Sequence, residues 1–191
     1  MSKAERVNFC FGIVLAAISL FFCGCASVHP PVDAPREPKH QERNSFYSLL
    51  YDLASKESDV DKILLLKHPN RETAALIREI ARTYQTAKHQ LEHFAGHDPS
   101  IHLKETQLPS SEQKTRDAID SAMSKRLLAA KHADFETLLL LSQAESLRYA
   151  TYLAKEAHKV ESDNLREDYL DQFAKQCEQL YEKVLSHFAT K

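Results

Sequence analysis

The body of this chain, residues 44–191, has very few residues that interrupt regular structure. They are one glycine and three prolines: Gly96, Pro69, Pro99 and Pro109. Apolar residues between them recur at i, i+3, i+4 and i+7, which is the period of one helix face, and no sustained alternation typical of β-strands occurs. We therefore predict a single all-α domain over residues 44–191.

Capping residues and prolines divide this domain into five predicted helices. They are Asn44–Lys67, Asn70–Gly96, Ser110–Lys131, Asp134–Lys159, and a last helix that begins between Ser162 and Asn164 and ends at Phe188. Asn70 and Asp134 are expected N-caps, and Ser110-Ser-Glu-Gln113 fits a capping box. Four of the helices are about 25 residues long, or about 37 Å at 1.5 Å per residue. Such lengths predict an antiparallel four-helix bundle, with the shorter helix in a long crossover of the ferritin-like kind.

The N-terminus reads as an export signal. Lys3 and Arg6 precede an apolar run from Phe9 to Cys23, and small residues follow it. A bilayer-spanning helix needs roughly 20 apolar residues, and this run is shorter. We expect residues 1–24 to be a signal peptide. An uncleaved membrane helix over residues 7–26 is the alternative.

The Gly24-Cys25 junction resembles the lipobox of bacterial lipoproteins. Phe22 and Cys23 stand where that family usually has Leu and a small residue. The resemblance implies that Cys25 is acylated and becomes the new N-terminus. Because no Asp follows the cysteine, it also implies a lipid anchor in the bacterial outer membrane, with the body in the periplasm.

A proline-rich segment, residues 25–43, links this cysteine to the body. Its prolines favour extended, polyproline-like conformations, so we predict a tether that holds the body away from the membrane. Beyond it the only cysteine is Cys177, which excludes a disulfide within the body. Its place in an apolar helix stripe predicts a buried, inert thiol rather than a redox centre. The net charge of −2 gives no basic footprint for nucleic acid.

The order of the helices resembles a ferritin-like bacterial family, domain of unknown function 4142. The resemblance depends on Glu57 in the first helix, Leu91-Glu-His-Phe-Ala95, Phe135-Glu136, and Leu180 with Phe188. It implies a ferritin-like bundle over about residues 45–188. In that family, histidines recur in the middle of three long helices. Here the nearest positions hold other residues: Thr83 or Tyr84, Ser146 or Leu147, and Lys183.

Two sets of residues are candidates for metal binding. Glu57 falls inside the apolar stripe of the first helix, and Glu145 lies at the edge of another stripe, so the two could meet in the interior. A carboxylate satisfied by a side chain or water is the simpler interpretation, in which case Glu57→Leu would be neutral or stabilising. His89, His93 and His97 repeat every four residues, a spacing that can bind zinc, nickel or copper. Their position opposite the apolar stripe favours a solvent-exposed polar face.

No phosphate-binding glycine loop or Ser/His/Asp order is present. We therefore expect a non-catalytic lipoprotein without a cofactor. Its partners would be the membrane, through acyl chains on Cys25, and an unidentified envelope protein. A metal-binding or redox bundle and a periplasmic chaperone-like stress protein are the alternatives.

Overall fold

The computed structural model describes residues 39–104, 106 and 108–189, and over these residues the chain is all-α with no strand. The elements are α1 (Lys39–Glu57), the 3₁₀ helix η1 (Val60–Leu65), α2 (Arg71–His97), α3 (Ser110–Ala129), α4 (His132–Val160) and α5 (Asn164–Ala189). The predicted all-α class is confirmed. The predicted signal peptide, Cys25 and most of the predicted tether lie outside the described residues.

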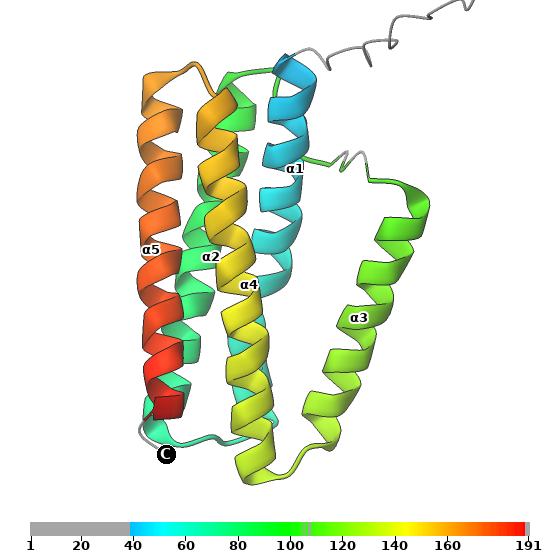
Figure 1. Ribbon diagram of the computed structural model, residues 1–191, viewed down its shortest axis with the longest axis vertical. Helices are drawn as coiled ribbons and strands as arrows, with labels where there is room; N and C mark the ends of the chain where they lie inside the picture. Colours follow the sequence, from blue (N-terminus) through cyan, green and yellow to red (C-terminus); the bar gives the residue numbers. More distant parts are fainter. Residues whose placement is uncertain (1–38, 105, 107, 190–191) are drawn as a thin grey trace, which may run out of the picture. The chain divides into compact units, whose positions relative to one another are not determined.

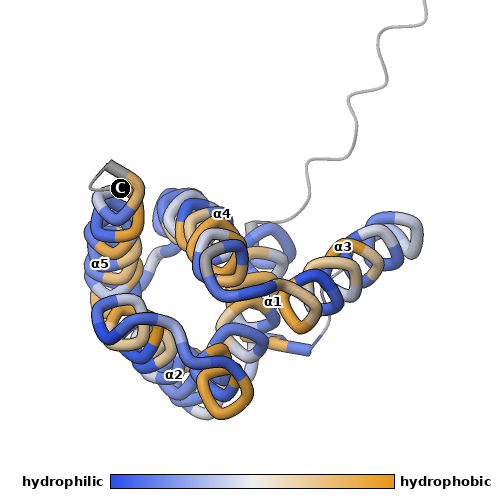
Figure 2. Tube along the Cα trace, turned by 90° about the horizontal axis from the view of Figure 1, so that it is seen from below, coloured by the Kyte–Doolittle hydropathy of each residue, from blue (hydrophilic) through white to orange (hydrophobic). Residues whose placement is uncertain are grey.

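Four of the helices surround one apolar core (Figures 1 and 2). α1 packs against α2 and α4, and α5 packs against α4 and α2, whereas α3 lies outside this group and contacts α4. The largest fully buried side chains come from all four core helices. They are Tyr47, Leu50, Ile77, Ile80, Tyr84, Leu91, Phe135, Leu139, Leu140, Leu147, Leu170 and Val184.

Helix α2 follows its sequence pattern closely. The Asn70 side chain accepts a hydrogen bond of 2.8 Å from the backbone N–H of Thr73, as expected of an N-cap. The apolar residues that recur at helical spacing between Asn70 and Gly96 are buried: Leu76, Ile77, Ile80, Ala81, Tyr84, Ala87, Leu91 and Phe94. The N-cap, the stripe and the end near Gly96 are confirmed.

The predicted first helix was wrong at both ends. α1 begins at Lys39, inside the predicted tether, and ends at Glu57, ten residues before Lys67. Beyond Glu57 the backbone changes to bonds between residues three apart: the N–H of Lys62 donates to the carbonyl of Asp59 at 3.0 Å. The chain then continues as η1, whose Leu64 still reaches the core.

Helix α3 departs most from its prediction. Pro109 takes the N-cap position and no side chain caps the helix, so the capping box from Ser110 to Gln113 was wrong. Only Leu127 is buried along its length, while Ile119 and Leu128 are 60% and 52% exposed. Its apolar side chains are therefore not gathered on one packed face. Helix α4 also starts two residues before the predicted cap Asp134, with Lys131 as its N-cap.

Candidate functional site

The inward-facing seam of α1 carries a polar residue near each end. Arg43, Tyr47, Leu50, Ala54 and Glu57 follow one another at helical spacing. The middle three are at most 2% exposed, and Arg43 is 4% exposed. Because buried charges need partners, both ends of this seam require polar groups from neighbouring helices.

At the Glu57 end the partner comes from α4. Gln143, only 2% exposed, donates a hydrogen bond of 3.0 Å from its Nε2 to Glu57 Oε2. Burial raises the pKa of the Glu57 carboxyl, and hydrogen bonds from Gln143 and Ser146 only partly offset this. The interpretation of Glu57 as a satisfied carboxylate inside the body is confirmed.

The hydrogen-bonded polar residues extend from Ser146 on α4 across the core to Tyr84 on α2. The hydroxyl oxygens of Tyr84 and Ser146 are 2.8 Å apart and hydrogen-bonded. Burial raises the pKa of the Tyr84 hydroxyl well above its usual value, so this group stays neutral. We call Glu57, Gln143, Ser146 and Tyr84 the central polar chain. It links α1, α4 and α2, and within the described part of the molecule the Gln143 Oε1 atom has no hydrogen-bond partner.

The central polar chain occupies the region where the family resemblance would place histidines. Tyr84 and Ser146 stand at two of those positions and bond to each other. Lys183, at the third, lies on the surface and forms an ion pair of 2.6 Å with Glu79. Glu145 is exposed on α4, whereas Gln143 and Ser146 are the α4 residues near Glu57. The hypothesis of a Glu57–Glu145 pair is therefore wrong. Among the residues described, no group of three or more His, Cys, Asp or Glu side chains could hold a metal ion.

Cys177 lies in the core of α5 and is fully buried. Burial raises the pKa of its thiol to about 12. A thiol in such surroundings stays protonated and unreactive. The predicted burial of Cys177 is confirmed.

A second polar cluster closes the other end of the α1 seam. The Glu161 side chain is fully buried and accepts hydrogen bonds of 2.6 Å from the Tyr47 hydroxyl and of 2.9 and 3.0 Å from Arg166. Arg166 Nη1 also lies 3.1 Å from Asp98 Oδ2, and Arg43 Nη1 lies 3.8 Å from the same oxygen. We call these five residues the end cluster. It joins α1, the loop after α2, and the junction of α4 and α5, with Glu161 at the end of α4 and Arg166 in the first turn of α5.

The electrostatics of the end cluster hold Glu161 ionised. Burial alone raises the pKa of this carboxyl, but Arg166, Tyr47 and the backbone N–H groups of Ser162 and Asp163 outweigh it and lower the pKa to about 2. The hydrogen bonds from Arg166 to this carboxylate raise the pKa of Arg166. Burial, and then the hydrogen bond to Glu161, raises the pKa of Tyr47. Two arginines face two carboxylates, so the cluster is balanced in charge. It is suited to fixing three chain segments in place.

Sequence reasoning missed the end cluster. Its members are spread over residues 43–166, and Tyr47 and its partner Glu161 are 114 positions apart. Arg43 also fell within the predicted tether. One signal was available: Tyr47 and Arg43 lie at i and i−4 on the face that Leu50 and Ala54 continue. An arginine on an apolar seam indicates a buried partner, but the sequence does not identify that partner.

The histidines of α2 lie on the surface. His89, His93 and His97 are all exposed, which confirms the predicted polar face. The ring centroids of His93 and His97 are 4.1 Å apart. His89 Nδ1 lies 3.3 Å from the Glu92 carboxylate.

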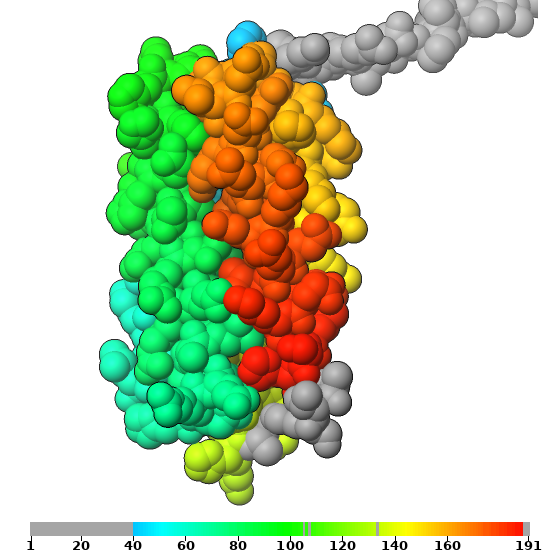
Figure 3. Space-filling model, turned by 90° about the vertical axis from the view of Figure 1, so that its left-hand side faces the viewer, coloured from blue at the N-terminus to red at the C-terminus, as the bar shows by residue number. Residues whose placement is uncertain are grey.

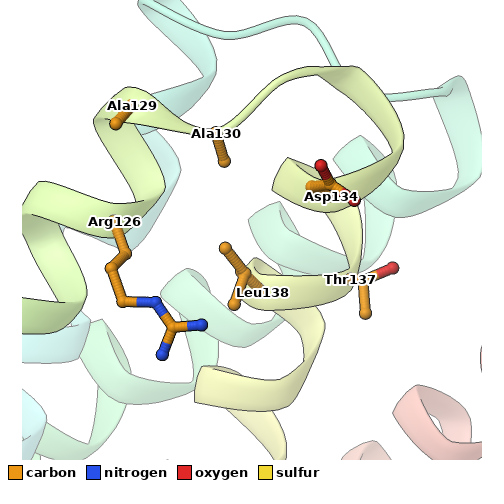
Figure 4. A pocket seen from close by; sticks show the side chains of 6 residues that line it. All are labelled: Arg126, Ala129, Ala130, Asp134, Thr137 and Leu138. Atoms are coloured by element: carbon orange, nitrogen blue, oxygen red, sulfur yellow. The ribbon is translucent and has the colours of Figure 1, made fainter.

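An open hollow lies where α3 meets α4 (Figure 4). It is lined by Arg126, Ala129, Ala130, Asp134, Thr137 and Leu138. Nearer the start of α3, Arg116 donates a hydrogen bond of 2.9 Å to the hydroxyl of Tyr149 on α4. Asp120 of α3 accepts a hydrogen bond of 3.1 Å from Lys56 on α1. These exposed polar contacts add to the apolar packing of Leu127 and Met123 of α3 against the core.

Comparison of the sequence with protein-family models found no match, and neither the curated proteins nor the solved structures gave one. Among the helices of the described residues, none has the length and apolarity that crossing a membrane requires.

Proposed function

We propose that this protein is a lipid-anchored envelope protein of two-membrane bacteria whose helical body acts by contact with another envelope protein rather than by catalysis. In this proposal Cys25 carries the acyl chains in the outer membrane, residues after it form a tether, and the body stands in the periplasm. The motif Phe22-Cys23-Gly24-Cys25 and the apolar run before it support the anchor. The body would be an antiparallel ferritin-like bundle of α1, α2, α4 and α5, with α3 in the crossover.

One observation supports a contact role above the others. The polar groups inside the body are largely bonded to one another, as in Tyr84–Ser146 and Tyr47–Glu161. Helix α3, in contrast, lies outside the core helices and exposes Ile119 and Leu128. Exposed apolar side chains on a helix outside the core suit protein contact.

Two variants test the anchor. Cys25→Ala should move the protein from the membrane to the soluble fraction of cell envelopes. Cys23→Ala is the matched control, since this residue would leave with the signal peptide. Retention of Cys25→Ala in the membrane would support the uncleaved N-terminal helix instead.

A photo-crosslinking amino acid at Ile119 or Leu128 tests the contact. We expect a defined adduct with one envelope protein in intact cells. Leu165 on α5, which is 78% exposed, is the control position and should give none. Equal labelling from all three positions, or none from α3, would count against a specific contact surface.

A chaperone-like function is the second candidate, and the exposed apolar residues around α3 and α4 favour it. Leu141, one turn beyond the hollow-lining Leu138, is 46% exposed. Such a surface could hold unfolded segments of other proteins. Suppression of aggregation by the wild type, lost on Ile119→Ser with Leu141→Ser, would support this candidate.

A further inference from the structure

The outward side of α2 brings two imidazole rings into contact near the end of the helix. His93 and His97 are four residues apart, which places them on one helix face. Their ring centroids are 4.1 Å apart and the rings are tilted by 35°. Both residues are exposed to solvent, on a helix whose outer side forms part of the molecular surface (Figure 3).

The backbone fixes the protonation pattern of one of these rings. His97 Nδ1 lies 2.8 Å from the carbonyl oxygen of His93. A carbonyl only accepts hydrogen bonds, so Nδ1 carries the proton, and in the neutral ring Nε2 keeps its lone pair. Metal-binding histidines use this arrangement, because a hydrogen bond from the second ring nitrogen to a carbonyl orients the ring and sets its tautomer.

We propose that His93 and His97 form a two-imidazole site for a borderline divalent cation such as Zn²⁺, Ni²⁺ or Cu²⁺. Imidazole nitrogens suit these ions, and a histidine pair at i and i+4 on one helix face can chelate them. Since no third His, Cys, Asp or Glu of the described residues joins the pair, water completes the coordination. This inference does not depend on the envelope role.

The neighbouring histidine provides a matched control. His89 is exposed on the same helix, one turn before His93, but its Nδ1 lies 3.3 Å from Glu92 Oε2. The other oxygen of Glu92 accepts a hydrogen bond of 2.9 Å from the Tyr51 hydroxyl. The ring of His89 is therefore directed to Glu92, whereas the rings of His93 and His97 contact each other.

Calorimetric titration of the full-length protein, purified in detergent without a histidine tag, with zinc chloride tests the site. We expect one Zn²⁺ per chain. His93→Ala and His97→Ala should each weaken binding by more than about tenfold, since even outer-shell partners of metal ligands are worth about 10–100-fold. The ring of His89 is directed to Glu92 and not to the pair. His89→Ala should therefore change the zinc affinity by less than about threefold, well below the 10–100-fold that loss of an outer-shell partner costs.

A second measurement keeps the assignment independent of any loss of folding. Zinc should shift the imidazole ¹⁵N resonances of His93 and His97 in the wild-type protein and leave that of His89 in place. It should also raise the melting temperature, because a ligand that binds only the folded state stabilises it. Absence of zinc binding, or a larger loss for His89→Ala than for His97→Ala, would overturn the proposal.

Discussion

The hydroxyl of Tyr47 donates a hydrogen bond of 2.6 Å to the carboxylate of Glu161, 114 positions further along the chain. Tyr47 is fully buried on the seam of α1, and Glu161 is the C-cap residue of α4. This bond therefore connects the first helix to the turn between the last two. Together with Arg166, it places a buried negative charge where three segments meet.

Removing the Glu161 carboxylate should destabilise the protein strongly. Glu161→Ala leaves Arg166 and Arg43 with Asp98 as their shared carboxylate, so the cluster carries an excess positive charge. Loss of one partner from a buried pair costs about 3–5 kcal/mol. Tyr47→Phe removes one hydrogen bond to a charged group and should cost less, about 1.5–3 kcal/mol. Urea unfolding followed by circular dichroism measures both. Glu156→Ala, at an exposed pair with Lys159, is the control and should cost at most about 1 kcal/mol.

The free energy of unfolding should change with pH as the Glu161 carboxyl titrates. Its folded-state pKa of about 2 lies below the ordinary value of 4.5, so the ionised carboxylate stabilises the fold above about pH 4.5. This contribution is lost progressively as the pH falls from 4.5 to about 2. The stability difference between the wild type and Glu161→Gln should thus be constant near neutrality and shrink in acid. A difference that does not change with pH would contradict the assignment.

The elements that could be predicted from the sequence are those whose signals are local. Asn70 and the continuous stripe of α2 define that helix by capping and periodicity alone. Cys177 could be placed in the core for the same reason. The first helix was predicted to reach Lys67 because apolar residues keep the helical period through Val60 and Leu64. The structure instead ends α1 at Glu57 and continues as the 3₁₀ helix η1, so this periodicity was misleading.

The parts that could not be predicted depend on contacts between distant segments. Glu57 was identified as an inward carboxylate, but its partner Gln143 was not, because an amide at an apolar position has no pattern of its own. Arg43 lies at helical spacing from Tyr47, but nothing in the sequence identifies Glu161 and Asp98, far along the chain, as the carboxylates near it. Whether α3 packs or stays outside depends on the space that α1 and α4 leave, and the apolar residues of α3 do not encode this.

The attachment of α3 to the body should depend more on one buried apolar residue, Leu127, than on the ion pair between Lys56 and Asp120. Leu127 is 9% exposed, whereas the side chains of Lys56 and Asp120 are 41% and 56% exposed. Leu127→Ala should cost about 2 kcal/mol, at the low end for a buried leucine. Asp120→Asn should cost less than about 1 kcal/mol. Hydrogen exchange of α3 amides would show which change releases the helix, and faster exchange in Asp120→Asn alone would contradict this order.

The pairing of Glu57 with Gln143 changes the outcome expected for a Glu57 substitution. From the sequence alone, Glu57→Leu would be neutral or stabilising, but Leu leaves the buried Gln143 Nε2 without an acceptor. A buried donor without a partner costs about 1–3 kcal/mol, so the free energy of unfolding should fall. Glu57→Gln keeps an acceptor and a similar shape, and should be close to neutral.

The double variant Glu57→Leu with Gln143→Leu separates this cost from a general loss of packing. When both partners become apolar, the unpaired donor disappears and much of the stability should return. The pH profile gives an independent check: burial raises the folded-state pKa of Glu57 above 4.5, so its contribution is full below that pH and declines as the pH rises through the folded-state pKa. Glu57→Gln should remove this decline. A single Glu57→Leu variant as stable as the wild type would show that Gln143 finds another acceptor.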